Sequence, residues 1–120
     1  MSDFTAAQVL ERVRAGRSLA GARLIGLSLA RADLSGANLA RAALIDCDLT
    51  GANLAGAILQ DARLKNTRLA GARLHETNLG GAVLSDCDAG GLTCEQSVLY
   101  KSTLQSTRLR GAVTSDSTST

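Results

Sequence analysis

Few side chains of this 120-residue chain could carry out acid, base or nucleophilic chemistry. His75 is the only histidine, and one imidazole supplies neither a histidine pair for a metal nor an obvious Ser-His or Cys-His couple. We therefore expect His75 to be a solvated side chain. The sequence predicts a protein that is not an enzyme, with no catalytic, metal-binding or cofactor-binding residues and no cofactor.

Two pairs of aspartates, Asp46 with Asp48 and Asp86 with Asp88, are the candidates for acid–base catalysis. In each pair a cysteine separates the two carboxylates, and the pair crosses a corner of the repeat described below. Arg68 lies midway between Asp48 and Asp88 in the sequence. This spacing favours charge neutralisation over proton transfer.

One cluster of like charge is a candidate partner surface. It is basic and consists of Arg63, Lys65, Arg68 and Arg73. We expect these residues to lie on successive sides of one coil, as a girdle that could contact a partner. The alternative is a solvated rim that nearby carboxylates partly neutralise. No aromatic side chain is interleaved for stacking on bases, so nucleic acid is not the expected partner.

The elements that position these groups follow from a strict repeat. Every fifth residue from Leu19 to Leu109 is leucine, except Ala89 and Cys94, and a small side chain usually lies two residues before it. A period of five matches neither the 3.6 of a helix nor the 2 of a strand. It fits a chain that turns a corner every five residues and stacks on itself. The predicted core stack consists of Leu24, Leu34, Leu39, Leu44, Leu49, Leu54, Leu59, Leu64, Leu69, Leu74, Leu79, Leu84, Leu99, Leu104 and Leu109.

A second period of twenty residues places Asp48, Arg68, Asp88 and Arg108 at one position of the coil. Neighbouring coils lie about 4.8 Å apart, as strands in a sheet do. These four residues would then form an outward surface charge ladder of alternating sign. Such alternation favours one stacking register, because like charges at this spacing repel.

The three cysteines lie at inward positions of the same repeat. Cys47 and Cys87 share a column but are two coils apart, which is roughly 9–10 Å and beyond the reach of a disulfide. Cys94 belongs to a different side. We interpret all three as small core residues in a reducing compartment, without a metal.

Two units, Ala32–Gly36 and Ala52–Gly56, match an A(D/N)LxG pattern, and Ala37–Arg41 matches it except at its last residue. The chain thereby resembles pentapeptide-repeat proteins over roughly residues 17 to 113. The resemblance implies an all-β fold, a right-handed quadrilateral β-helix with four pentads per coil and about five coils. The central leucine and the small residue two positions before it would point inward.

We divide the chain into a capping helix (1–16), a β-solenoid (17–113) and a disordered polar tail (114–120). Thr5 and Gln8 have the spacing of a capping box, and Gly16 is placed to end the helix. The helix would cover the apolar end of the first coil, because an open solenoid end invites edge-to-edge aggregation. No second cap is evident, so a homodimer through the C-terminal coil is a further possibility.

Composition restricts the function classes. The net charge is only +2, with one Phe, one Tyr and no Trp, and neither a membrane span nor a signal peptide is recognised. We expect a soluble, cytoplasmic bacterial protein that presents flat faces to a protein partner as a non-enzymatic interaction or scaffold module. One alternative is a DNA gyrase-binding quinolone-protection protein, although that activity requires a strongly acidic surface. Another is an accessory protein of a bacterial secretion or effector system.

Overall fold

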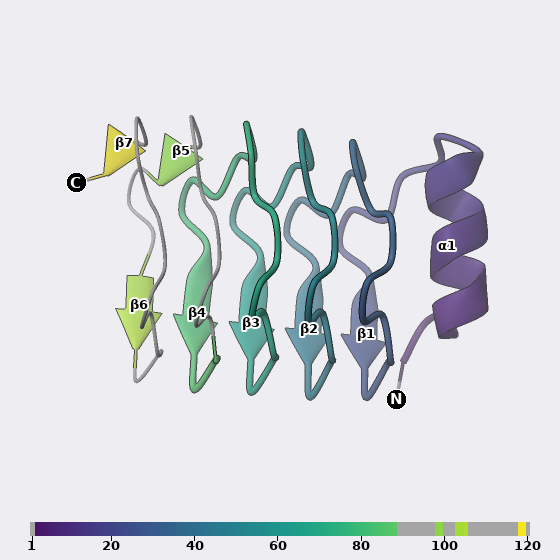
Figure 1. The fold of residues 1–120 in the computed structure, drawn as a ribbon, viewed down its shortest axis with the longest axis horizontal. Coiled ribbons are helices and arrows are strands. Elements are labelled where there is room, and N and C mark those ends of the chain that lie inside the picture. Colours follow the sequence, from purple (N-terminus) through teal and green to yellow (C-terminus); the bar gives the residue numbers. More distant parts are fainter. Residues whose placement is uncertain (1, 89–97, 100–102, 106–117, 120) are drawn as a thin grey trace.

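A computed structural model describes residues 2–88 and, beyond them, the short strands at 98–99, 103–105 and 118–119. In chain order the elements are helix α1 (Ala6–Arg14) and strands β1 (Arg23–Ile25), β2 (Ala43–Ile45), β3 (Arg63–Lys65), β4 (Val83–Ser85), β5 (Val98–Leu99), β6 (Thr103–Gln105) and β7 (Thr118–Ser119). Figure 1 shows β1 to β4 side by side, with α1 at one end of the row.

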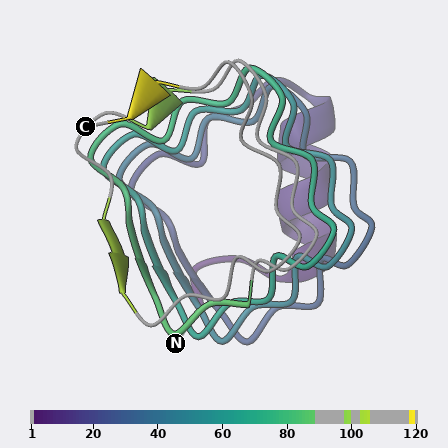
Figure 2. The same ribbon diagram turned by 60° about the vertical axis from the view of Figure 1, so that its left-hand side comes forward.

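The strands stack with an offset of twenty residues. β1, β2, β3, β4 and β6 form one parallel sheet in that order, and Leu24 lies opposite Leu44, which lies opposite Leu64. Outside the named strands, a parallel bridge of the same offset joins Asn38 to Ile58. Each turn of the chain therefore lies over the one before it, as Figure 2 shows. The twenty-residue period of the sequence is the stacking period of the structure.

Leucine side chains fill the interior. From Leu19 to Leu84, every leucine of the five-residue series is at most 5% exposed. The small residues two positions earlier are buried with them, except Ala32, which is half-buried. Burying one leucine contributes roughly 1.5–3 kcal/mol, so this column supplies most of the stability. The side chains of Leu99, Leu104 and Leu109 lie outside the described part of the chain.

The corners share one backbone conformation. Every fifth residue from Gly16 to Asp86 has a positive φ, between 51° and 72°. Glycine adopts this conformation without steric cost because it has no Cβ. At seven of these corners the residue is polar or charged instead, for example Arg31 with φ 60° and Glu76 with φ 56°. The corners thus fix the five-residue spacing and project polar side chains outward.

Buried hydroxyls and thiols add donors to several leucine carbonyls. Away from the sheet the leucine carbonyl accepts the N–H three residues later, as Leu54 does from Ala57 at 3.0 Å, and Leu54 also accepts the Thr77 hydroxyl at 2.7 Å. On the sheet side, the Leu44 carbonyl accepts the hydroxyl of Thr67 from the next turn at 3.0 Å. The thiols of Cys47 and Cys87 donate in the same way, to the carbonyls of Leu24 at 3.1 Å and Leu64 at 3.4 Å. A carbonyl oxygen has two lone pairs, and alanine at these positions would supply no side-chain donor to them.

Helix α1 has the capping that its sequence predicts. Gln8 N–H donates to Thr5 Oγ1 at 3.2 Å, and Thr5 N–H donates to Gln8 Oε1 at 2.9 Å. After the helix, Gly16 N–H donates to the Val13 carbonyl at 3.1 Å. Val9 is 1% exposed within the leucine core, and Phe4, Ala6, Leu10 and Val13 pack against it. The helix therefore lies on the apolar end of the first turn (Figure 1).

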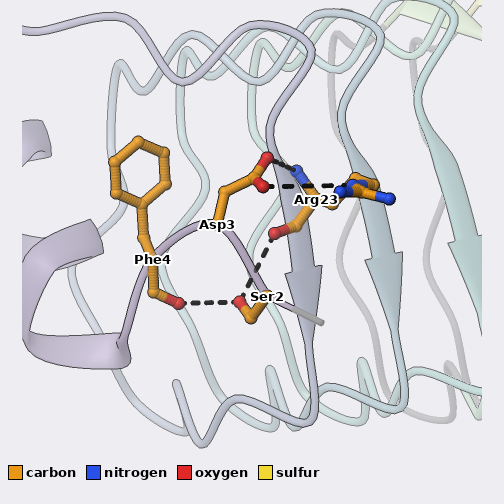
Figure 3. Close-up of polar contacts among 4 residues, drawn as sticks. All are labelled: Ser2, Asp3, Phe4 and Arg23. Atoms are coloured by element: carbon orange, nitrogen blue, oxygen red, sulfur yellow. Dashed lines mark hydrogen bonds and ion pairs between the residues drawn. The ribbon is translucent and has the colours of Figure 1, made fainter.

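Ahead of the helix, Ser2 and Asp3 cover the outer edge of β1 (Figure 3). The repeat pattern does not predict this contact. Asp3 N–H donates to the Arg23 carbonyl at 2.7 Å, and Arg23 N–H donates to Asp3 Oδ2 at 2.8 Å. Ser2 Oγ donates to the Phe4 carbonyl at 2.7 Å. An edge strand with unpaired backbone groups recruits other chains, so this short arm protects the first turn.

Within the segment expected to be a disordered tail (114–120), Thr118–Ser119 forms β7. This strand pairs in parallel with β5, and Val98 lies opposite Thr118. The offset is again twenty residues, so the stacking frame extends past residue 113. This ordered pairing differs from the expectation for these two residues. The remainder of the segment and the surface expected to form a homodimer lie outside the described residues.

The Thr67 hydroxyl gives a first test of this account. Thr67→Val keeps the shape of the side chain but removes the hydroxyl that donates to the Leu44 carbonyl, and should lower the free energy of unfolding by about 0.5–1.5 kcal/mol. Thr67→Ser retains the hydroxyl and should be the more stable of the two variants. Chemical denaturation measures the free energy of unfolding of both variants. A Thr67→Val protein as stable as the parent would contradict a stabilising role of the Thr67 hydroxyl.

Helix α1 gives a second test. Val9→Asp buries a carboxylate in the end of the leucine core and should lower the free energy of unfolding by at least about 2 kcal/mol. Exposure of the first turn should also promote self-association. Ala7→Asp adds the same charge on the exposed face of the helix and is the matched control. Denaturation and light scattering would show no difference between the two variants if α1 were not a cap.

Candidate protein-interaction face

The outward residues of the sheet follow from strand alternation. In each strand the central leucine points inward, so the residues on either side of it face outward. In β3 these are Arg63 and Lys65, which are both exposed. The outward residues of β2 and β4 are half-buried. We call the outward surface of β1 to β4 the sheet face, which comprises Arg23, Ile25, Ala43, Ile45, Arg63, Lys65, Val83 and Ser85.

The sheet face contains a shallow hollow of ≈ 500 Å³. Its wall and floor come from three neighbouring strands, β2, β3 and β4. Ala43 lies opposite Arg63, and Ser85 lies opposite Lys65, so each long cationic side chain has a short neighbour. The other lining residues include Ile45 and Val83. The hollow therefore combines an aliphatic floor with two cationic groups.

The charge of the sheet face is of one sign. Strands β1 to β4 contain three cationic residues and no acidic residue. Arg23 is engaged by the N-terminal arm, with its Nε 3.9 Å from Asp3 Oδ1 (Figure 3). Among the residues from 2 to 88, neither Arg63 nor Lys65 has a carboxylate within ion-pair distance. Two cations without an ion-pair partner in this part of the chain thus remain on this face.

The four basic residues of the predicted girdle are distributed differently from the expectation. Arg63 and Lys65 share β3 and flank Leu64, so they lie on one side of the coil and not on two. Arg68 lies on another side, opposite Asp48, and Arg73 lies opposite Asn53. The period of two residues around Leu64 would have revealed this grouping. The girdle therefore reduces to a pair of cations on the sheet face and two separate arginines.

The predicted charge ladder is aligned over its described members. Parallel bridges join Asp48 to Arg68 and Arg68 to Asp88, and Arg108 lies outside the described residues. The Asp48 carboxylate is held chiefly within its own turn, because Oδ1 accepts the Thr50 hydroxyl at 2.6 Å and the Thr50 N–H at 3.0 Å. These bonds lower the pKa of Asp48, and the charge of Arg68 lowers it less.

The remaining candidates for chemistry are placed as structural or solvated groups. Cys47 and Cys87 are free and buried, and burial raises the pKa of both thiols. Cys94 lies outside the described residues. His75 is exposed, with Nε2 3.5 Å from Glu76 Oε1. Within the described part of the chain no group of three metal-ligating side chains occurs, and none of its helices is long and apolar enough to span a bilayer.

The Asp48 turn can be tested by titration. Because its folded pKa is lowered, the ionised carboxylate stabilises the fold above its ordinary pKa, and this contribution disappears as the pH falls through the folded value. Thr50→Ala should raise the pKa of Asp48 more than Arg68→Ala does. Carboxylate NMR titration measures both shifts, and a larger effect of Arg68→Ala would show that the ladder, and not the turn, holds Asp48.

Comparison with solved structures relates this fold to known proteins. A pentapeptide repeat protein (Rfr23) from the cyanobacterium Cyanothece 51142 is 23% identical, with a TM-score of 0.52, over 95% of this chain and 99% of that chain. HetL, a pentapeptide repeat protein involved in heterocyst differentiation regulation from Nostoc sp. strain PCC 7120, is 29% identical over 84% of this chain and 59% of that chain, with a TM-score of 0.44. A pentapeptide repeat protein from the Arabidopsis thaliana thylakoid lumen is 24% identical over 86% of this chain and 64% of that chain, also with a TM-score of 0.44.

No curated protein sequence matches the chain significantly. The family model for pentapeptide repeats matches it in eight copies, over residues 18–51, 47–86 and 77–113. These matches cover most of the chain and coincide with the five-residue spacing of the buried leucines. The chain therefore belongs to the pentapeptide repeat family.

Proposed function

We propose that this protein is a non-enzymatic interaction module that binds a protein partner through the sheet face. The observation that carries the proposal is the hollow of the sheet face, which combines two cations with aliphatic side chains. On the sheet face, Arg63 and Lys65 stand beside aliphatic side chains in a shallow hollow and have no ion-pair partner within residues 2–88.

Elsewhere, many outward polar side chains are engaged by their own backbone. Asp33 and Asp48 accept the N–H of the residue two positions later. Asn38, Asn53 and Asn78 do the same, at 3.0–3.2 Å. Such turns satisfy the side-chain acceptor locally and rigidify the corner. These acceptors already make a bond within the molecule, whereas the cations Arg63 and Lys65 have no ion-pair partner within residues 2–88.

We also infer that the complete fold is a right-handed quadrilateral β-helix of about five coils. Support comes from the family and from the five strands of the main sheet, which recur at one twenty-residue offset. A stack of this kind is a rigid platform. Binding to a rigid surface loses little conformational entropy on the platform side, which favours a docking role.

The gyrase-binding alternative depends on an acidic, DNA-like surface. The sheet face is cationic, and the net charge of the chain is +2. The sheet face therefore supports docking of a protein segment better than imitation of a polyanion. The proposal does not extend to secretion, for which no described residue offers a specific observation.

A photocrosslinking series within one turn tests the choice of face. A benzoylphenylalanine placed at Ile45, Thr50, Ala55 or Gln60 samples the four sides of the same turn, since these positions are five residues apart. In the native host, position 45 should yield a discrete crosslinked protein and the other three should not. The thermal stability of the four variants is the control for folding. No adduct at position 45, or a stronger adduct from another side, would contradict the proposal.

A further inference from the structure

We infer that the sheet face recognises an extended acidic segment of the partner, with two carboxylates spaced two residues apart and aliphatic side chains beside them. This inference rests on the proposed function and specifies the chemistry of the partner. It is carried by the spacing of Arg63 and Lys65, by the aliphatic floor around them and by the acidic corners that border the face.

The spacing of the two cations matches an extended peptide. Arg63 and Lys65 flank Leu64 on β3, so their backbone positions are about 6.6–6.8 Å apart. Side chains on one face of an extended peptide repeat at the same distance, between residues i and i+2. A segment that lies along β3 can therefore place one carboxylate over each cation.

The floor of the hollow adds an apolar component. Ile45 on β2 and Val83 on β4 lie to either side of β3, in strands that pair with it directly. Both are half-buried in the free protein, so each keeps apolar surface that a partner could cover. Aliphatic side chains flanking the two carboxylates would contact this surface. Charge alone would give weak binding, because exposed ion pairs contribute little.

Acidic corners limit how much negative charge the face accepts. Asp61 precedes β3, while Asp46 and Asp86 follow β2 and β4. Each of these corners has a positive φ and lies one or two residues from the end of its strand, at the border of the face. Asp46 is further held by Asn66, whose Nδ2 donates to its Oδ1 at 2.8 Å. A polyanion that runs beyond the two cations meets these carboxylates, whereas a short acidic pair does not.

The same features disfavour nucleic acid as the occupant. A nucleic acid strand carries a phosphate at every step, so it would extend over the acidic corners. Proteins that bind single strands usually add aromatic side chains on which bases stack. The outward residues of β1 to β4 include no aromatic side chain. An acidic peptide therefore fits this face better than an oligonucleotide.

Binding of defined peptides tests the inference. The probe is fluorescein-labelled Leu-Ser-Glu-Ser-Glu-Ser-Leu, compared with a version that has Gln in place of Glu and with one that has adjacent Glu residues. At low salt the first probe should bind tightest and shift the amide NMR signals of β2, β3 and β4. Arg63→Gln with Lys65→Gln should weaken it about fivefold, the effect expected for two exposed ion pairs. Arg68→Gln with Arg73→Gln makes the same change of net charge on other sides and should leave the affinity within about twofold.

The outcomes separate this inference from the proposed function. Equal binding of the Gln and Glu probes, or equal effects of the two double variants, would overturn the inference. Tighter binding of a labelled single-stranded oligonucleotide to the same strands would also overturn it. If position 45 still crosslinks to a protein when one of these results is obtained, the sheet face remains the docking site and only the inferred chemistry of the partner is wrong. Loss of that crosslink in the Arg63→Gln, Lys65→Gln protein would support both the proposed function and this inference.

Discussion

The stacking of leucine on leucine at an offset of twenty residues is the constraint on which the rest of the structure depends. Leu24, Leu44 and Leu64 lie directly opposite one another and are almost fully buried. Since each described turn contains the same number of residues, the neighbours of any residue are those twenty positions before and after it. A one-residue insertion would move every following leucine out of its column, and the apolar surface that it buries would be lost.

Because of this constraint, residues twenty positions apart form columns along the stack. Each column has a different physical role. In the inward column next to the sheet, Cys47, Thr67 and Cys87 each donate to a carbonyl of the preceding turn. Asp and Asn occupy several outward columns, where they accept the N–H groups of their own corners. The outward columns of the sheet face serve neither purpose. Their side chains are set by alternation about a buried leucine and otherwise remain free to vary.

How much the sequence could predict follows from the range of each interaction. The buried leucines, the twenty-residue register and the capping box of α1 could be read directly, because each depends on spacing within a repeat or within one helical turn. The contact between Asp3 and Arg23 could not, because it joins a non-repeating arm to the edge of β1. The grouping of Arg63 with Lys65 does not follow from the period of five. The direction of these two side chains is decided by the period of two within β3.

The separation of inward from outward residues also bears on how a docking surface can arise on this fold. An outward residue of the sheet contributes little to the leucine stack, so its replacement changes the surface and leaves the core unchanged. On β2 and β4 these positions hold small, aliphatic or hydroxyl side chains, whereas on β3 both are cationic and long. Alternating charges would improve stacking between turns, and the bridge between Asp48 and Arg68 places opposite charges on neighbouring turns. Two cations on one strand, without carboxylates on the strands beside them, do not serve that purpose, and for this reason we propose a partner of opposite charge for this face.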